Sequence, residues 1–275
     1  MISGANAVSS RQLMQMRAGV RIKTIALPAE HGGWGFLLEP VALGLLLAPS
    51  VAGCYLAISA VGCFLARQPL SLVFLNWRRP SPRTALAQRF AAIYLIIGLA
   101  GLTAAICFTQ HSFLLPLLIA APFAGVQLAH DWMGRRRVLF PEIAGVIAIA
   151  SLAPAIALAG GWSLRVSFAL WAVMIARAVP SIIYVRACLA RLHRRPASIS
   201  PILISHVLGL LVVAVLMGAE LIPVLGVVVM ILLLIRAAVG FAKCETVTPK
   251  QLGFSEIFFG AATVLAVVLG MTFGL

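Results

Sequence analysis

The chain has 275 residues, of which 62% are hydrophobic and 10% charged, and its mean hydropathy is +1.08. A soluble domain carries roughly 25% charged residues, so this composition excludes a soluble globule and makes lipid the solvent. The formal net charge of +14 raises a nucleic-acid partner as an option. The basic residues are dispersed, however, and no zinc-finger, RRM-like or helix-turn-helix signature accompanies them. We therefore expect membrane lipid, and no nucleic acid, as the partner.

Residues 1–29 are polar to mixed and predict a cytoplasmic N-terminal tail, and residues 30–275 predict one transmembrane helical domain. A spanning helix needs roughly 20 mostly apolar residues. The predicted spans are 33–49, 51–75, 85–108, 112–130, 139–159, 163–187, 200–218, 221–241 and 254–274. The chain is thus expected to form an all-α, polytopic transmembrane bundle of about nine helices.

Charge alternates between the connections of these spans. Most of the Lys and Arg residues lie in the tail, in alternate loops or in the helix turns beside those loops, and Arg165 is the exception. The positive-inside rule then places the N-terminus inside and the C-terminus outside. We expect a multi-pass protein of the bacterial cytoplasmic (inner) membrane.

Five cysteines occur at Cys54, Cys63, Cys107, Cys188 and Cys244. None has the CxxC or Cys/His spacing of a metal site. Four lie in predicted spans, where a free cysteine behaves as a small hydrophobic residue. We expect no disulfide.

The first polar group stands where the chain enters the membrane. It comprises Glu30, His31, Trp34 and Glu39, interleaved with glycines that permit close backbone approach. Glu39 lies about two turns deep and needs a cation or a proton. The alternative is structural, with Trp34 as an interfacial anchor and Glu39 paired with an Arg of another helix.

The second group follows the second span. Arg67, Gln68 and Asn76 precede a basic, proline-rich turn that contains Arg78 and Arg79. Two cations and two amides at a helix end are able to grip a phosphate. The alternative, a topology signal, explains Arg78 and Arg79 well but Arg67 and Gln68 poorly.

The third group surrounds the loop near residues 131–137. Asp131 precedes Arg135, Arg136 and Arg137, and we expect it to pair with one of these three. Glu142 starts the next span and is expected to be buried.

The fourth group lies in the sixth predicted span. Arg177, Ser181 and Tyr184 follow i, i+4, i+7 spacing and share one stripe, and Arg186 comes shortly after them. An Arg at the depth of Arg177 costs a few kcal/mol unless it is paired or hydrated. We therefore expect these residues to face a polar cavity near the cytoplasmic side, with Glu39 as a possible counter-charge.

Three isolated polar residues complete the pass. His206 is expected to make an interhelical hydrogen bond, Arg236 to snorkel, and Glu256 to accept from an Arg. The candidate ligand-binding residues are Glu30, His31, Trp34, Glu39, Arg67, Gln68, Asn76, Arg177, Ser181, Tyr184 and Arg186. No catalytic residue is assigned, because no motif of a soluble enzyme is present.

The segment from Pro28 to Trp34 (PAEHGGW) resembles the opening motif of the YwiC-like family of bacterial membrane proteins. The Arg135–Arg137 run with Pro141 and Glu142, and the two motifs at 177–180 and 184–186, also resemble that family. The resemblance runs from about residue 25 to the end of the chain. It implies a membrane protein but transfers little chemistry.

The nine-span, N-in architecture is also similar to that of the UbiA-type intramembrane prenyltransferases. Those enzymes hold Mg²⁺ and a prenyl diphosphate through Asp-rich motifs at the ends of their second and sixth helices. The corresponding positions of this chain carry Arg67, Gln68, Asn76, Arg78 and Arg79, and then Arg177, Tyr184 and Arg186. Because no Asp is among them, we expect no metal and no cofactor. An Arg-lined cavity could still bind an anion directly.

Three functions stay open on the sequence. The first is a metal-independent or degenerate UbiA-like protein that binds an anionic isoprenoid or other lipid, which a large Arg-lined cavity would favour. The second is a transporter or permeation protein for a small anion, which broken helices and an internal repeat would favour. The third is a non-catalytic accessory protein, for example of a respiratory complex, which a sealed core with mutually paired polar residues would favour.

Overall fold

A computed structural model describes residues 22–27, 31–77, 81–109, 111–135 and 138–275, without the side chains of Lys23, His31, Gly32 and His111. The described part is helical, with no strand among these residues. Its elements are α2 (Ile22–Ala26), α3 (His31–Leu47), α4 (Val51–Leu75), α5 (Pro82–Phe108), η1 (His111–Phe113), α6 (Leu114–Trp132), α7 (Leu139–Ala150), α8 (Leu152–Ala159), α9 (Leu164–Leu192), α10 (Ser200–Gly218), α11 (Val224–Ala242), η2 (Cys244–Thr246) and α12 (Pro249–Phe273). The all-α prediction is confirmed.

The apolar segments of the sequence correspond to the observed helices. Eight helical segments of the described chain are long and apolar enough to cross a membrane. The first predicted span, α3, is shorter at 17 residues, or about 25 Å at 1.5 Å per residue. That length still falls within the range of roughly 17–25 residues that spanning helices show. The chain is therefore a multi-pass helical bundle of the kind that the sequence predicts.

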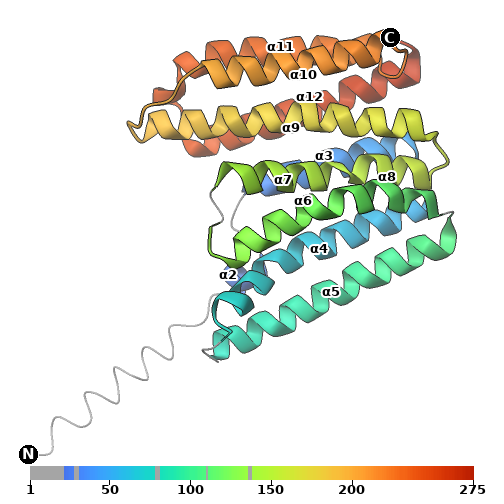
Figure 1. Ribbon diagram of the computed structural model, residues 1–275, viewed down its shortest axis with the longest axis vertical. Coiled ribbons are helices and arrows are strands. Elements are labelled where there is room, and N and C mark those ends of the chain that lie inside the picture. Colours follow the sequence, from blue (N-terminus) through green and yellow to red (C-terminus); the bar gives the residue numbers. More distant parts are fainter. Residues whose placement is uncertain (1–21, 28–30, 78–80, 110, 136–137) are drawn as a thin grey trace, which may run out of the picture.

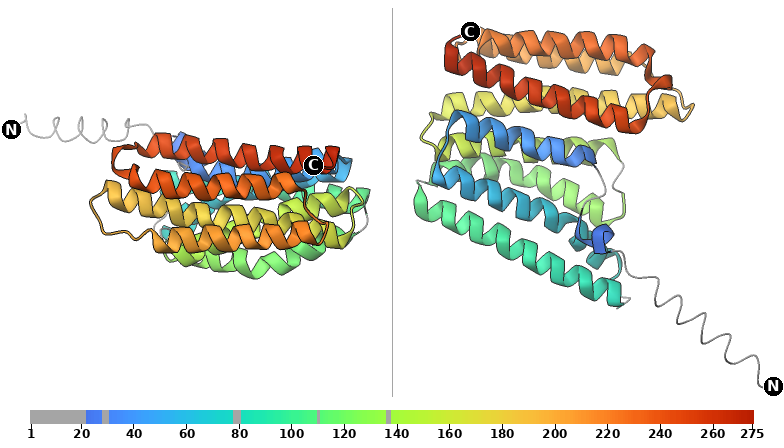
Figure 2. Two further views of the ribbon diagram at one scale, coloured as in Figure 1. Left: turned by 90° about the horizontal axis from the view of Figure 1, so that it is seen from above. Right: turned by 180° about the vertical axis from the view of Figure 1, so that it is seen from behind.

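The long helices lie side by side and run crosswise to the long axis of an elongated slab (Figures 1 and 2). The connections after α4, α6, α9 and α11 lie at one end of the helices, and those after α3, α5, α8 and α10 lie at the other (Figure 1). Among the described residues, Arg135, Arg194, Arg195 and Lys243 are in connections of the first end. Glu220 and the helix-start residue Arg165 are at the second end. The charge asymmetry of the sequence thus becomes an asymmetry of the bundle.

The fifth predicted span is not one continuous helix. It breaks at Ser151 into α7 and α8. Pro154 has no N–H to donate to the carbonyl of Ala150, so the ladder cannot continue through this turn. The Ser151 hydroxyl instead donates to the carbonyl oxygen of Ala148 over 2.6 Å, and Ala155 N–H donates to the Ser151 carbonyl over 3.1 Å. A serine and a proline together therefore produce a mid-membrane interruption.

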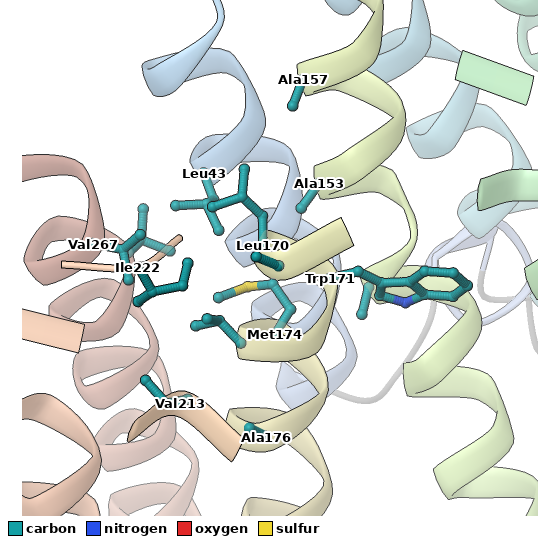
Figure 3. Close-up of a cluster of buried hydrophobic side chains, with 14 of the residues drawn as sticks. Leu43, Ala153, Ala157, Leu170, Trp171, Met174, Ala176, Val213, Ile222 and Val267 are labelled. Atoms are coloured by element: carbon teal, nitrogen blue, oxygen red, sulfur yellow. The ribbon is translucent and has the colours of Figure 1, made fainter. Parts of the chain in front are cut away.

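The largest cluster of buried apolar side chains ties α3 and α8 to the C-terminal helices. Figure 3 shows Leu43 of α3 and Ala153 of α8 together with Leu170 and Met174 of α9 and Val267 of α12. These residues are less than a tenth exposed. The N-terminal and C-terminal halves of the bundle therefore share one core.

The helices α4 and α5 approach each other through small residues. A Cβ at Gly62 would lie 2.7 Å from the backbone nitrogen of Gly98 and 2.9 Å from the carbonyl oxygen of Tyr94. The Ser59 hydroxyl donates to the Gly98 carbonyl over 2.8 Å. Small residues and interhelical hydroxyl bonds are the usual means by which membrane helices pack closely. Glycine at position 62 is a requirement of this contact.

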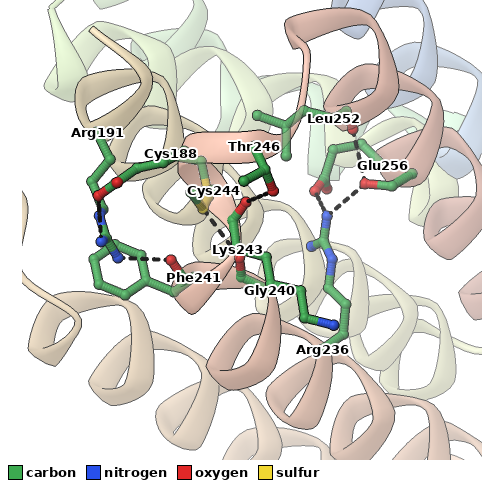
Figure 4. Close-up of a disulfide and its surroundings, with 12 residues drawn as sticks. Cys188, Arg191, Arg236, Gly240, Phe241, Lys243, Cys244, Thr246, Leu252 and Glu256 are labelled. Carbon is green, nitrogen blue, oxygen red and sulfur yellow. Dashed lines mark hydrogen bonds and ion pairs between the residues drawn. A yellow bond between two sulfur atoms is a disulfide. The ribbon is translucent and has the colours of Figure 1, made fainter. Parts of the chain in front are cut away.

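The expectation of no disulfide is wrong. Cys188, near the end of α9, and Cys244, in η2, are joined as a disulfide with their Cα atoms 5.0 Å apart (Figure 4). The two residues are far apart in sequence, so no motif indicated the pairing. The fold brings them together because η2 packs against the end of α9, where Arg191 also reaches Glu245 over 2.6 Å. Cys54, Cys63 and Cys107 are free.

Candidate functional site

Four charged side chains from four helices meet inside the bundle. Glu39 (α3), Arg177 (α9), Arg236 (α11) and Glu256 (α12) form what we call the buried charge cluster. Arg177 Nε lies 3.0 Å from Glu39 Oε2, and Arg177 Nη1 lies 3.6 Å from Glu256 Oε2. Arg236 Nη2 is paired with the other Glu256 oxygen, Oε1. The cluster therefore contains two cations and two anions, and its formal charge is zero.

Arg177 is the most deeply buried member of the cluster. It lies near the middle of α9 and is 1% exposed. Its Nη1 donates to the Ser181 hydroxyl over 3.0 Å, and its Nη2 donates to the backbone carbonyl of Glu256 over 2.7 Å. The guanidinium also lies 5.7 Å from the centre of the Phe36 ring. The predicted stripe of Arg177 and Ser181 is confirmed, as is the contact with Glu39.

Arg236 does not snorkel to the surface, contrary to the sequence prediction. Its side chain is 11% exposed and donates to Glu256 and to the Ser255 hydroxyl (Figure 4). Its guanidinium lies 4.1 Å from the centre of the Tyr184 ring and 5.0 Å from that of Phe259. A cation gains about 2 kcal/mol or more from an aromatic face when both are removed from water. Ring contacts and a carboxylate therefore hold Arg236 inside.

Several polar atoms of the cluster have no hydrogen-bond partner among the described residues. They are Arg177 Nε, Arg236 Nη1 and Glu256 Oε2. His206 Nε2, outside the cluster, also has no hydrogen-bond partner among these residues. Arg177 Nε is close to Glu39 but is not aligned with it for a hydrogen bond. Leaving a buried polar group unpaired costs about 1–3 kcal/mol, and more for a charged one. The cluster thus has unused donors and an unused acceptor at its centre.

His206 lies in α10, and its other ring nitrogen, Nδ1, lies 2.8 Å from the Ile202 carbonyl oxygen one turn earlier. The predicted interhelical hydrogen bond is therefore wrong for this residue, because the bond stays within its own helix.

Gly209, one turn after His206, explains how close α10 lies to α9. A Cβ at Gly209 would lie 2.6 Å from the Ala176 carbonyl oxygen.

Prolines stand beside two of the buried charges. Pro40 follows Glu39 inside α3, and Pro180 lies one turn after Arg177 inside α9. A proline inside a helix removes the hydrogen bond to the carbonyl four residues earlier. The carbonyl groups of Phe36 and Ala176 are thereby released from the helical ladder. The charges thus sit at weakened points of their helices.

A glycine makes room for the Glu39 carboxylate. A Cβ at Gly260 of α12 would overlap Glu39 Oε1 and would lie 3.0 Å from Arg177 Nη2. Gly35, one turn before Glu39, leaves a more relaxed distance of 3.7 Å to the same oxygen. The backbone of α12 at Gly260 therefore forms one wall of the carboxylate's seat.

The predicted polar cavity is closed in this structure. Glu39 and Glu256 are each 8% exposed. A cavity of about 10 Å³, room for roughly one water, lies beside the disulfide and is lined by Tyr184, Cys188, Leu189, Leu192, Cys244, Val247, Pro249 and Leu252. A recess of about 100 Å³ lies at Val73, Trp77, Ser81, Thr84, Ala85 and Gln88. Neither is lined by a charge of the buried cluster.

A second polar site is separate from the cluster. Arg67 of α4 binds Asp131 of α6 through two nitrogens, at 2.5 and 3.1 Å. The Gln127 amide, with its oxygen turned toward Arg67, accepts from both terminal nitrogens at 3.1 Å. The sequence did not predict this pair, because it assigned Asp131 to the adjacent Arg run; two members of that run, Arg136 and Arg137, lie outside the described residues. Arg67 is 29% exposed, so this site reaches the bundle surface.

The remaining candidate residues are dispersed. Gln68 Nε2 lies 3.4 Å from the Thr24 carbonyl oxygen, and the exposed Asn76 side chain donates to the Leu72 carbonyl of its own helix. Trp34 packs edge-on against Phe64, with ring centres 5.1 Å apart. Arg186 pairs with Glu142 over 2.8 Å.

Glu142 is half-buried rather than fully buried, because it stands in the first turn of α7. Glu30 lies outside the described residues, as do Arg78, Arg79, Arg136 and Arg137; for His31 only the backbone is described. Of the eleven candidate residues, the structure thus brings Glu39, Arg177, Ser181 and Tyr184 together. Arg236 and Glu256 stand out in the sequence as single polar residues but are not among the candidates, and no sequence signal marks Gly260. Arg236 and Glu256 each lie about two turns inside a helix end, and this depth was the available signal.

Within the described part of the chain, no group of three or more His, Cys, Asp or Glu side chains is placed to hold a metal ion.

The apolar spanning helices and the buried charges define a polytopic α-helical membrane protein. Residues 27–157 match the model of the YwiC-like protein family, which confirms the resemblance for the part of the chain from α3 to α8. No curated protein and no solved structure matches the chain. The UbiA-like arrangement of the helices therefore stays a prediction.

Proposed function

We propose that the protein transports a small anion across the membrane and that the buried charge cluster is its closed gate. The observation that carries this proposal is the pair of buried arginines, Arg177 and Arg236, each with a donor that lacks a partner. Ionisable groups inside a membrane are expensive and usually mark ion or substrate paths. An anion that reaches the cluster would find two guanidinium groups already desolvated.

The closed packing favours a small ion over a lipid. A site for an anionic isoprenoid or another lipid would need a large cavity lined by Arg, whereas Arg177 is enclosed by protein. A transporter passes through closed conformations, so a sealed cluster is one state of such a cycle. This supports anion transport over the degenerate prenyltransferase among the sequence hypotheses.

Interrupted helices support a moving gate. The break at Ser151 and the prolines Pro40 and Pro180 all lie in helices that surround the cluster or pack against its helices. Transporter sites are commonly built beside discontinuous helices, where a change of backbone angle requires few bonds to break. The ion pair between Glu39 and Arg177 would close the gate, because it joins α3 to α9.

We propose the bacterial inner membrane as the location, with the N-terminus inside. Support comes from the basic residues at the bundle end that holds the α9–α10 and α11–α12 connections. Basic loops remain preferentially on the cytoplasmic side.

Anion flux in reconstituted vesicles tests the proposal. The purified chain is placed in proteoliposomes, and uptake of labelled chloride, formate and phosphate is compared with uptake by protein-free vesicles. At least one of these probes should enter faster with protein present. Arg177→Lys should lower that uptake about tenfold or more, because lysine lacks the planar fork of arginine. Arg165→Lys is the matched control, since Arg165 is exposed at the start of the same helix.

An accessory role is the second candidate, and the mutual pairing of all four charges favours it. Such a cluster would then serve to hold four helices in one arrangement for a partner protein. Folded protein that passes none of the three probes faster than empty vesicles would refute transport and leave this role.

A further inference from the structure

The atoms that hold Arg177 fall into two kinds. Its two terminal nitrogens donate to the Ser181 hydroxyl and to the Glu256 backbone carbonyl, neither of which titrates between pH 4 and 10. Nη1 also lies 3.6 Å from the Glu256 carboxylate, which Arg236 binds as well. Its Nε faces Glu39 at 3.0 Å in a contact too poorly aligned for a hydrogen bond. Arg177 would therefore stay in place if Glu39 withdrew. Glu39 is the exchangeable ligand of this guanidinium.

The Glu39 carboxylate lies between the backbone of α12 and the Arg177 guanidinium. The Gly260 backbone forms one wall, and a Cβ there would occupy the position of Glu39 Oε1. The Nε of Arg177 lies 3.0 Å from the other carboxylate oxygen, Oε2. A planar group with two oxygens matches the geometry of a guanidinium. A free molecule that carries the same group would fit where Glu39 now lies.

Because Glu39 itself is a carboxylate, we infer that the transported anion is a small monocarboxylate, which takes the place of Glu39 on Arg177 while Glu39 takes up one proton. This inference rests on the proposed transport function. The exchange balances: the Glu39 carboxylate gains H⁺ and becomes neutral, and the incoming R–COO⁻ supplies the charge that was lost. The cluster keeps its formal charge of zero, so the substrate and the proton move together.

The groups that face Glu39 are consistent with this exchange. Arg177 of α9 is paired with Glu39, and Glu256 of α12 is the nearby like charge. Arg236 of α11, Tyr184 of α9 and His206 of α10 lie on the far side of the network, around Glu256 and Arg236. The helix α8, which also packs against α3, has no titratable residue, and α4 and α7 direct Arg67 and Glu142 into other pairs. Glu256 keeps Arg236 as its partner throughout. Of the two carboxylates in the cluster, Glu39 is therefore the one that is paired with a single cation.

Formate is the probe, because it is the smallest monocarboxylate and stays ionised at neutral pH. Its apparent affinity for the purified protein is measured by thermal stabilisation at constant ionic strength, with chloride as the reference anion. If one proton enters with each formate, the apparent Kd should rise about tenfold per pH unit wherever Glu39 is ionised. In Glu39→Gln the seat carries no titrating group, so formate should bind with a Kd that does not change with pH.

Two glycines of α12 give a matched pair of variants. Gly260→Ala puts a methyl group into the carboxylate seat and should weaken formate binding at least tenfold. Gly253→Ala lies in the same helix in open space and should leave the affinity within twofold of the parent. Circular dichroism and size exclusion check that each variant is folded. Equal formate affinity in both variants would overturn the assignment of the seat.

The outcomes separate this inference from the transport proposal. The exchange is supported if the apparent Kd for formate rises about tenfold per pH unit in the parent and does not change with pH in Glu39→Gln. Chloride or phosphate uptake with no formate binding leaves anion transport standing and overturns the monocarboxylate. Formate binding that has the same Kd at every pH in the parent overturns the proton exchange. Absence of uptake for every probe overturns both proposals.

Discussion

Removal of Arg177 tests the energetics of the cluster directly. In Arg177→Ala, Glu256 keeps Arg236, whereas Glu39 loses its only cation at a site where it is 8% exposed. Deleting one partner of a buried pair costs about 3–5 kcal/mol, because the other charge stays buried without compensation. Adding Glu39→Gln removes that charge and should recover part of the loss. The remainder reflects the volume and the Ser181 bond that alanine cannot replace.

The measurement is a double-mutant cycle on the free energy of unfolding in detergent, followed by denaturant or heat. Arg177→Ala alone should lower stability by about 3–5 kcal/mol, and the double variant should be more stable than this single variant by about 1 kcal/mol or more. Arg165→Ala, at the exposed start of the same helix, serves as the control and should change little. An Arg177→Ala protein as stable as its parent would refute the view that this charge is structurally paired.

Four further predictions follow from other parts of the molecule. Gly62→Ala should lower the unfolding temperature markedly, because its Cβ would meet the α5 backbone, whereas Gly125→Ala, in open space, should not. A periplasmic-type reporter fused after Leu275 should be active and a cytoplasmic-type one inactive, and the reverse would refute the nine-span topology. Maleimide should label three cysteines of the denatured, unreduced chain and all five after reduction, because Cys188 and Cys244 are joined. Anion uptake should persist in EDTA, and reversible loss on chelation would indicate a metal requirement.

The spans were predictable because every helix that crosses lipid needs about 20 mostly apolar residues. Length and hydropathy placed 51–75 and 200–218 at their observed bounds. The break at Ser151 was not predicted, although Pro154 stands three residues later. A proline within a long apolar run leaves the hydropathy unchanged, so a window of 20 residues does not register the lost hydrogen bond. The missing N–H of Pro154, and not the burial of side chains, therefore determines where α7 ends and α8 begins.

The cluster was predictable only in part, for a different reason. The depth of Arg177 and Glu39 in their spans made each need a partner, and few opposite charges were available at that depth. Arg236 lies nearer a helix end. In an isolated helix, its guanidinium would have a lower free energy at the membrane interface, reached by snorkelling, than in the hydrocarbon. The aromatic rings of Tyr184 and Phe259 reverse that preference, and no sequence pattern places them around Arg236. The partner of Asp131 was missed similarly, because proximity along the chain drew attention to the adjacent Arg run and not to Arg67 of α4.

The cluster also bears on where the folding unit ends. The YwiC-like match stops within α8. Glu39 lies inside the matched part, whereas its counter-charge Arg177 and the other two members of the cluster lie beyond it. A chain cut after residue 157 would leave the Glu39 carboxylate in the membrane without a cation, at a cost of several kcal/mol. It would also expose the faces of α3 and α8 that pack on α9 and α12. The matched segment therefore packs on the helices that follow it, and the charges that would carry its function are completed only by α9, α11 and α12.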